Sequence, residues 1–378
     1  MIPSIQPFRK RSNWLASIAV EVLAPALRQY ARRRTAQDLR PPRQWMKALI
    51  LGDNHIGDLL YRTCSLRALK SGLPDCDFYY LAAAGSADIL AGNPWLKAVL
   101  PWARSDSRLD ISMEHMQQLR DMHFDAALCT NCIRYWPELS LAISLGIPNR
   151  AGYTYKGFSG WVTHPMPILY PQTFPQYFRH YVSALTGNHL PAPIPMVPEI
   201  VLSQADEAEA SAVWDSLTLG SSRVLACFPA DRQNTASWPV EHYVSLFNML
   251  SSRLQVRVVL MGAATDKAFL HDISARASMR IPVISGELSL RGLASFLKRC
   301  SIVLAKDSGP RHIANAVGTP ALFFRNTASS QIETGTYCDS EVDLVPSGEF
   351  LNPRRQKELL MRVNPSEVCS HIVRILSR

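Results

Sequence analysis

The sequence predicts an α/β fold with two open parallel sheets. Short apolar runs of strand length alternate with segments of helical spacing, the pattern of parallel sheets covered by helices on both faces. This alternation occurs twice, and a stiff Pro-rich stretch at 190–198 separates the two series. The polar residues that are candidates for catalysis or ligand binding lie in loops directly after predicted strands, where parallel sheets bind their ligands.

The first series begins after Pro41 and Pro42. Its first apolar run ends in a Gly-Asp loop, and apolar side chains then recur at helical spacing. The rest of this half alternates in the same way, and Gly146 marks the end of its last helix. The expected strands are 48–51, 77–81, 98–100, 125–129 and 150–153, and the expected helices are 59–70, 87–91, 113–122 and 136–145.

The second series follows the Pro-rich stretch. Its strands are rich in Val, Ile, Leu and Phe, as expected for strands buried on both faces. The expected strands are 224–228, 256–261, 281–284, 302–305 and 321–324, and the expected helices are 240–254, 266–277, 290–298, 310–317 and 365–376.

The chain of 378 residues is long enough for two domains with full cores. The boundaries that we expect are a basic amphipathic leader at 1–46, a first sheet domain at 47–190, a linker at 191–200, a second sheet domain at 201–355 and a C-terminal helical segment at 356–378.

The leader holds most of the positive charge. Residues 1–46 contain nine Lys and Arg and two acidic residues, so they carry +7 of the formal net charge of +9. A nucleic-acid partner is not expected, because it needs a basic face across the fold. The apolar stretch at 14–27 is too short to span a bilayer. It can lie in an anionic membrane interface, and the alternative is a disordered or core-docked leader.

The cysteines indicate a reducing compartment. Eight are scattered through the chain, mostly in apolar surroundings, which suits free thiols in a cytoplasm. Cys129 and Cys132 form a lone C-x-x-C pair with no second pair, so a zinc site is not expected. No G-x-G-x-x-G follows a strand, which argues against a nicotinamide dehydrogenase, and no cofactor is expected.

The run from Lys306 to Ala316 is the most informative stretch. It follows a predicted strand and begins a predicted helix, so backbone N–H groups and the helix dipole favour an anion there. Gly309 permits close approach of a phosphate, and Pro310 suits a first helical turn. The alternative is an ordinary helix start capped by Asp307 or Ser308.

The ordered motifs of residues 47–338 resemble the bacterial heptosyltransferases of glycosyltransferase family 9. The resemblance rests on Ile56-Gly57-Asp58, Ala91-Gly92-Asn93-Pro94, Gly146 to Tyr153, Ser237-Trp238-Pro239, Met261-Gly262 with Asp266, and Asp307-Ser308-Gly309-Pro310 with His312. It implies a GT-B fold, with two Rossmann-like parallel-sheet domains facing a central cleft. The activity it implies is inverting transfer of heptose from ADP-heptose to a lipopolysaccharide core, without a metal, at the cytoplasmic face of the inner membrane.

The resemblance also implies roles for individual residues. In the first domain, which would bind the acceptor, Asp58 would be the general base, because a carboxylate must reach the acceptor hydroxyl. His55 could assist proton transfer or only cap the turn. By position alone, Arg134, Tyr153 and Lys156 could contact acidic groups of the acceptor.

The second domain would bind the nucleotide sugar. Ser308 and Gly309 would stabilise the charge of the leaving diphosphate, and Asp307 would orient their loop. His312 could donate to phosphate or only pack. Asp266 could accept hydrogen bonds from ribose hydroxyls or only cap its helix, and the backbone near Leu288 would meet the adenine.

One departure from the family concerns a Lys that is usual before the Trp-Pro pair, where this chain has Ala236. Arg232 could replace its charge, and Arg325 is a second candidate. The lost Lys supports a rival interpretation, a transferase of the same fold with another nucleotide sugar or a protein acceptor. A second rival is a sugar-nucleotide-binding protein without turnover, against which Asp58 argues.

Overall fold

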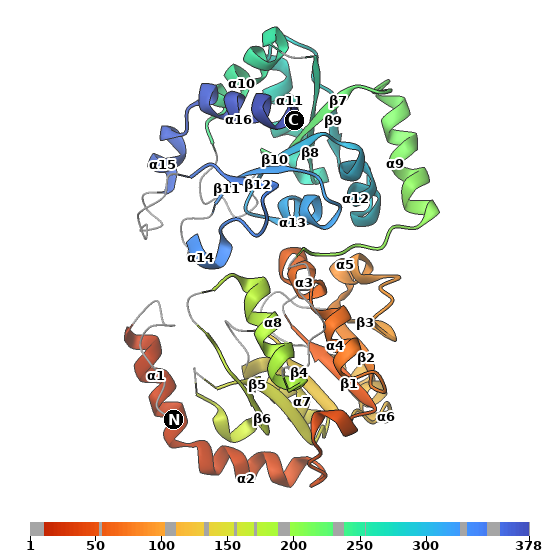
Figure 1. The fold of residues 1–378 in the computed structure, drawn as a ribbon, viewed down its shortest axis with the longest axis vertical. Coiled ribbons are helices and arrows are strands. Elements are labelled where there is room, and N and C mark those ends of the chain that lie inside the picture. The colour runs from red at the N-terminus through yellow and green to blue at the C-terminus, as the bar shows by residue number, and fades with distance from the viewer. Residues whose placement is uncertain are drawn as a thin grey trace. The chain divides into compact units, whose positions relative to one another are not determined.

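Each half of the chain folds around its own six-stranded parallel sheet (Figure 1). In the computed structural model the chain forms two compact units, Met1–Met196 and Val197–Arg378. Their boundary in the sequence falls within the Pro-rich stretch. The residues that the structure describes are 11–52, 55–102, 111–131, 136–154, 157–169, 172–187, 197–229, 238–253, 255–325, 331–345 and 356–377.

The sheet of the first unit has the strand order β3-β2-β1-β4-β5-β6, and every neighbouring pair is parallel. The five strands expected from the sequence are all present, and β6 is a further edge strand. Pro165 at its centre concealed β6, because proline lacks the N–H of a ladder bond and is confined to sheet edges. The strands are β1 (Lys47–Leu51), β2 (Asp77–Ala83), β3 (Ala98–Trp102), β4 (Ala126–Cys129), β5 (Asn149–Tyr153) and β6 (His164–Met166).

The helices of the first unit connect these strands and cover the sheet. The expected helix at 59–70 is two helices, α3 and α4, which meet near Cys64. Helix α8 was not expected from the sequence, and it packs on α3 and β6. The helical elements are η1 (Pro42–Gln44), α3 (Ile56–Thr63), α4 (Leu66–Gly72), α5 (Ala84–Ala87), η2 (Asp88–Leu90), α6 (Met113–Asp121), α7 (Trp136–Ser144), η3 (Ser159–Trp161) and α8 (Phe174–Leu185).

The segment that the sequence sets apart as a leader packs against the first unit. It forms α1 (Arg11–Val22) and α2 (Ala24–Arg34), and α2 packs on η3 and α7. Glu21 accepts hydrogen bonds from the backbone N–H and the hydroxyl of Ser159. A Cβ on Gly160 would lie 2.2 Å from the carbonyl oxygen of Ala24, so only glycine permits this approach of α2. Of the alternatives that the sequence left open, the described residues therefore adopt the core-docked arrangement.

The second sheet repeats the strand order of the first. Its order is β12-β11-β10-β7-β8-β9, again parallel throughout. Counted from the first strand of each sheet, both orders read 3-2-1-4-5-6, the doubly wound order of nucleotide-binding sheets. The strands are β7 (Arg223–Cys227), β8 (Val256–Gly262), β9 (Val283–Ser285), β10 (Ile302–Lys306), β11 (Ala321–Phe324) and β12 (Glu341–Asp343).

The second unit has helices on both faces of its sheet. Helices α10, α11 and α16 pack on one face, whereas α12 and α13 lie together on the other and α9 packs on α12. Helix α9, not expected from the sequence, is tied to α12 by Asp206 and Arg291, 2.5 Å apart. The helical elements are α9 (Gln204–Ser216), α10 (Val240–Arg253), η4 (Ala264–Asp266), α11 (Lys267–Arg276), α12 (Leu290–Arg299), α13 (Gly309–Ala316), α14 (Gln331–Thr334), α15 (Gln356–Arg362) and α16 (Pro365–Leu376).

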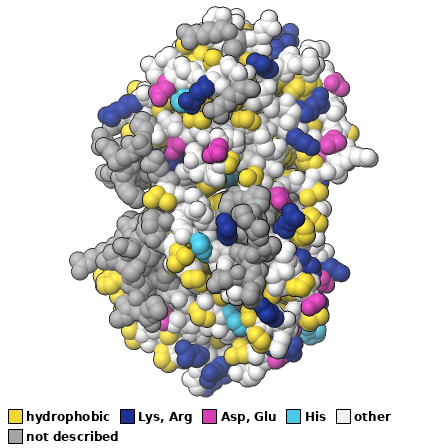
Figure 2. All heavy atoms as spheres, viewed as in Figure 1, with side chains coloured by type: hydrophobic (Ala, Val, Ile, Leu, Met, Phe, Trp, Pro, Cys, Tyr) yellow, Lys and Arg dark blue, Asp and Glu magenta, His cyan; other side chains and the backbone are white. Residues whose placement is uncertain are grey.

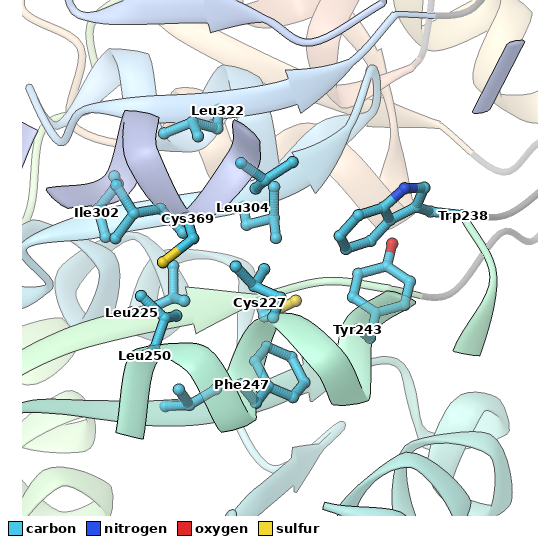
Figure 3. Packing of buried hydrophobic residues seen from close by; sticks show 14 of the residues in the cluster. Leu225, Cys227, Trp238, Tyr243, Phe247, Leu250, Ile302, Leu304, Leu322 and Cys369 are labelled. Atoms are coloured by element: carbon cyan, nitrogen blue, oxygen red, sulfur yellow. The ribbon is translucent and has the colours of Figure 1, made fainter. Parts of the chain in front are cut away.

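Trp238 anchors the core between this sheet and α10 (Figure 3). Its ring is 1% exposed and meets the ring of Tyr243 edge-on at 4.8 Å between centroids. Its Nε1 donates to the carbonyl oxygen of Val363 at 3.0 Å, which joins the start of α10 to the segment before α16. The Trp-Pro pair singled out in the sequence therefore has a packing role here.

We expect Trp238→Phe to lower the free energy of unfolding by about 2–4 kcal/mol, because it leaves a cavity and a buried carbonyl without its donor. Urea denaturation measures this. The control is Trp136→Phe, since Trp136 is 51% exposed. Equal midpoints for the two variants would contradict the anchoring role of Trp238.

Candidate active site

The candidate residues lie where each strand order reverses. In the first sheet this point lies between β1 and β4, and in the second between β7 and β10. Chains leaving adjacent strands in opposite directions open a crevice at their carboxyl ends, which is where doubly wound sheets bind ligands. Asp58 follows β1, and Asp307 follows β10. Each unit therefore brings its main candidate residue to its own switch point.

Asp58 lies in the first turn of α3, where the helix dipole favours a carboxylate. The hydroxyl of Tyr61, one turn later, donates to its Oδ1. The ring of Tyr61 stacks on that of Phe174 from α8, with 5.4 Å between centroids. Arg62 donates from Nη1 to the Asp58 carbonyl oxygen at 2.5 Å. Two hydrogen bonds from the same helix thus hold the carboxylate and its backbone, and the ring stack holds Tyr61.

Gly52 follows β1 and lies in a tight polar pocket of the same edge. A Cβ there would lie 2.9 Å from Thr130 Oγ1, 3.0 Å from the Tyr80 hydroxyl and 3.1 Å from Arg62 Cζ. These three side chains are buried, and they come from the end of β4, from β2 and from α3. The sequence did not single out Arg62 or Tyr80, because each lies inside an apolar segment of ordinary helix or strand pattern.

The other residues expected at the acceptor divide into three groups. His55 is exposed and is the N-cap position of α3. Arg134 and Lys156 lie outside the described residues. Tyr153 is corrected as an acceptor contact: it ends β5, as expected from the strand at 150–153, but its side chain is fully buried. Its hydroxyl donates to the carbonyl oxygen of Tyr177 at 3.3 Å, so Tyr153 is a core residue.

The turn after β10 presents the start of α13. Ser308 is exposed and extended at the N-cap position, and Gly309 and Pro310 begin the helix. Among the described residues no side chain caps this helix, since the Ser308 hydroxyl donates back to the Lys306 carbonyl oxygen at 3.3 Å. The ordinary side-chain cap, which the sequence left open, is not formed. The turn can therefore receive an anion on its backbone N–H groups.

Asp307 is held in place by Arg311, a residue that the sequence interpretation missed. Arg311 Nη1 donates to Asp307 Oδ1 at 2.7 Å, one helical turn away. The other four N–H donors of Arg311 bind the Glu341 carboxylate and the carbonyl oxygens of Thr334 and Gly335, at 2.5–3.1 Å. Its Cζ lies 3.5 Å from the centroid of the Phe323 ring.

All five guanidinium donors of Arg311 are thus satisfied by the protein, and the side chain is fully buried. Burial opposes the charged form, but the carboxylates of Asp307 and Glu341 raise the pKa of Arg311 above its usual value. The charge of Arg311 therefore stabilises the fold, and the guanidinium has no N–H donor left for a ligand. A signal in the sequence could have found it, because Asp307 and Arg311 have the i, i+4 spacing of a helical ion pair.

His312 is buried beside this network. Its ring stacks on Tyr337 with 6.0 Å between centroids, and Nε2 lies 3.9 Å from Asp307 Oδ1. Burial, and then the neighbouring charge of Arg311, lower the pKa of His312 to about 3. The imidazole is therefore neutral at physiological pH, and a role as a cationic phosphate ligand is not available to it.

The remaining residues expected at the nucleotide lie at the same carboxyl edge or outside the described residues. Asp266 ends η4, and its Oδ2 accepts from the backbone N–H of Ala263 at 2.8 Å, so it fixes its own turn. Leu288 is half-buried in the loop between β9 and α12. Arg232 and Ala236 lie outside the described residues.

Arg325, the second candidate for the missing charge, directly follows β11 and is 2% exposed. Its Nε donates to Asp343 Oδ2 at 2.9 Å. Its Nη2 is buried and has no hydrogen-bond partner in the part of the chain that the structure describes. Burial raises the pKa of Asp343, and the charges of Arg325 and Arg311 act against this shift.

No three His, Cys, Asp or Glu side chains among the described residues could hold a metal ion together. None of the helices in the described part of the chain is long and apolar enough to cross a membrane.

We expect the stability of the fold to decrease as the pH falls below about 6.5, where an unfolded histidine takes up a proton and the buried His312 does not. His312→Gln should therefore reduce the loss of melting temperature between pH 7 and pH 5. The control is the exposed His271→Gln, which should leave that loss unchanged. A wild-type loss that His312→Gln does not reduce would contradict the buried neutral imidazole.

Comparison with known proteins agrees with this geometry. A family model described as glycosyltransferase family 9 (heptosyltransferase) matches residues 113–355. Lipopolysaccharide heptosyltransferase 2 of Escherichia coli is 24% identical over 291 residues, which are 73% of this chain and 81% of that protein.

Two solved structures share the fold and support the expected GT-B class. The family 9 glycosyltransferase of Veillonella parvula has a TM-score of 0.74 at 17% identity, covering 90% of this chain and 99% of that chain. The Escherichia coli heptosyltransferase WaaC with ADP-2-deoxy-2-fluoro heptose has a TM-score of 0.64 at 18% identity, with 87% and 99% covered. Since the family model matches more than half of its residues, this chain belongs to glycosyltransferase family 9, the heptosyltransferases.

Proposed function

We propose that this protein transfers a heptosyl residue from ADP-heptose to a lipopolysaccharide core acceptor, with inversion at the anomeric carbon. The family match supports sugar transfer, and the curated relatives are named as lipopolysaccharide or lipooligosaccharide heptosyltransferases. The structure of WaaC with an ADP-heptose analogue supports the choice of nucleotide sugar.

The observation that carries the proposal is the turn between β10 and α13. It combines an uncapped helix start, the small residues Ser308 and Gly309, and a carboxylate that is bound by Arg311. A diphosphate leaving group gains negative charge in the transition state, and fixed backbone donors stabilise that charge. The Asp307 carboxylate would repel the same diphosphate if it were not held by Arg311.

Asp58 is the proposed general base. The acceptor hydroxyl oxygen forms a bond to the anomeric carbon as the bond from that carbon to the ADP oxygen breaks. The hydroxyl proton passes to the Asp58 carboxylate, and ADP leaves with the electron pair of the broken bond. The hydrogen bond from Tyr61 orients the Asp58 carboxylate for this step, and the helix dipole is favourable to its negative charge.

The other residues of the second unit would bind the nucleotide. Neutral His312 would assist as a packing group or hydrogen-bond partner beside the phosphates. Asp266 has one carboxylate oxygen on its own turn, so the other oxygen would receive a ribose hydroxyl. The backbone near Leu288 would meet the adenine, and Arg232 would add positive charge at the phosphates. At the acceptor, Arg134 and Lys156 would contact acidic groups of the core, and His55 would assist proton transfer.

We expect Asp58→Asn to reduce kcat at least 10³-fold, because the amide cannot accept the proton. ADP affinity, measured by calorimetry, should stay within about twofold of the wild type. The exposed Asp75→Asn in the same unit is the control and should keep full activity. Near-normal turnover by Asp58→Asn would remove Asp58 from the mechanism.

The proposal also places the enzyme in the cytoplasm, at the inner face of a bacterial inner membrane. The surface that would dock combines apolar and basic side chains of α1 and α2, and we call it the α1–α2 surface. Val22 is 74% exposed, and Leu15 and Leu23 are exposed as well. Three consecutive arginines, Arg32 to Arg34, end α2 and are exposed. In Figure 2, Lys and Arg side chains lie together at the bottom of the view, where Figure 1 places α2.

The geometry of α2 supports this orientation. Ala24 and Ala31 are its buried residues, seven positions apart, so they lie on one face of the helix. At 100° per residue, Arg33 lies opposite that face. Exposed apolar side chains beside arginines favour an anionic membrane surface, because lipid tails take up the apolar groups and headgroups attract the charge.

We expect the protein to sediment with vesicles that contain phosphatidylglycerol and not with pure phosphatidylcholine vesicles. Replacing Arg32, Arg33 and Arg34 by Gln should weaken binding more than tenfold, at about 1 kcal/mol for each charge. A matched triple change of the exposed Arg257, Lys267 and Arg280 to Gln is the control. Equal loss in both triple variants would show general charge attraction and contradict a specific α1–α2 surface.

A further inference from the structure

We infer that Arg325 provides the positive charge that faces the diphosphate at the start of α13. This inference rests on the proposed function, and it assigns the diphosphate charge to the second of the two arginines expected from the sequence, since the first, Arg232, lies outside the described residues. Two arginines of the second unit, Arg311 and Arg325, are buried, with side chains 0% and 2% exposed.

The edge strand β12 gives each arginine one carboxylate. Glu341 pairs with Arg311, and Asp343 pairs with Arg325. Glu341 and Asp343 are two residues apart in a strand, so their side chains point to the same face of the sheet. Both arginine heads therefore lie on that face.

That face is the one on which α13 packs. Arg311 belongs to α13, and its guanidinium covers the ring of Phe323. Phe323 is the register partner of Asp343 in the neighbouring strand. Arg325 follows Phe323 by two residues, which agrees with its head lying on the same side. The influence of Arg311 on the pKa of Asp343 also shows that these charges are near one another.

Arg325 also lies at the same end of the sheet as the turn between β10 and α13. Lys306 of β10 is the register partner of Phe324 of β11, and the backbone N–H of Asp307 donates to the Phe324 carbonyl oxygen at 3.0 Å. Arg325 is the next residue after Phe324, and Ser308 is the next residue after Asp307. The arginine and the uncapped helix start thus leave adjacent parallel strands side by side.

The two arginines differ in what they have left to bind. Arg311 spends all five N–H donors on protein acceptors. Arg325 uses Nε on Asp343, and among the described residues its buried Nη2 has no acceptor. A buried charged donor without a partner is costly, and such groups are rare unless a ligand completes them. A phosphate oxygen matches the planar fork of a guanidinium.

The test compares affinities for ADP and for adenosine, measured by calorimetry at constant salt. We expect Arg325→Met to weaken ADP binding at least tenfold and adenosine binding less than twofold, because only ADP has the diphosphate. Arg325→Lys should restore part of the ADP affinity. The control is Arg257→Met, an exposed arginine of the same unit, which should change neither affinity.

A second variant protects the test against misfolding. Arg325→Met leaves Asp343 without its cation, so the double variant Arg325→Met with Asp343→Asn removes the pair together. It should fold, as judged by its melting temperature, and show the same selective loss for ADP. Unchanged ADP affinity, or equal loss for ADP and adenosine, would overturn the assignment of Arg325.

The same measurements separate this inference from the proposed function. If the wild type prefers UDP to ADP, the ADP-heptose proposal fails, and the ratio of UDP to uridine affinity then tests Arg325 in the same way. If the wild type binds ADP and Arg325→Met binds it equally, only the inference fails. If the wild type binds no nucleoside diphosphate, both fail.

Discussion

The parallel arrangement of all strands is the constraint on which this structure depends. Parallel strands need helical crossovers, and the crossovers cover both faces of each sheet, so both faces must be apolar. Polar chemistry is then confined to the loops at the strand ends. Because both sheets have the order 3-2-1-4-5-6, each has one switch point at its carboxyl edge. Asp58 and the turn before α13 lie at these two points for that reason.

The second unit combines this constraint with buried charge. Arg311 joins Asp307, Glu341 and the segment at 334–335 through five hydrogen bonds, so the start of α13 is fixed before any ligand arrives. A preorganised anion site of this kind does not lose binding energy in reorganisation. Burial, and then the charge of Arg311, keep His312 neutral by lowering its pKa. The buried charges of Arg311 and its carboxylate partners thus determine the electrostatic environment of the turn before α13.

Sequence reasoning found most regular elements because their apolar periodicity is strong. It missed β6 and β12, which are three-residue edge strands with too little pattern. It did not predict that the helix at 59–70 is two helices or that the leader is two helices, because these helix ends depend on packing. It offered Tyr153 as an acceptor contact, although the side chain is fully buried at the end of a strand. The turn between β10 and α13 was recognisable because a strand, small residues and a helix are consecutive in the chain. Arg311 and Arg62 were not singled out. Each has a partner four residues away, but the segments that bury them, at 334–341 for Arg311 and around Gly52 for Arg62, are distant in the chain.

Local sequence patterns were enough to predict the two parallel sheets, the strand-to-helix turn at Asp307 to Pro310 and the place of Asp58 between a strand and a helix, although the helix begins at Ile56 and not at Leu59. These depend on local pattern and on backbone conformation, which short stretches of chain specify. Folding decides that the leader packs on Gly160, that Arg311 has all its N–H donors bound, and that Arg325 Nη2 has no acceptor among the described residues. Burial and hydrogen-bond partners are properties of segments brought together by folding, and no spacing in the chain encodes them.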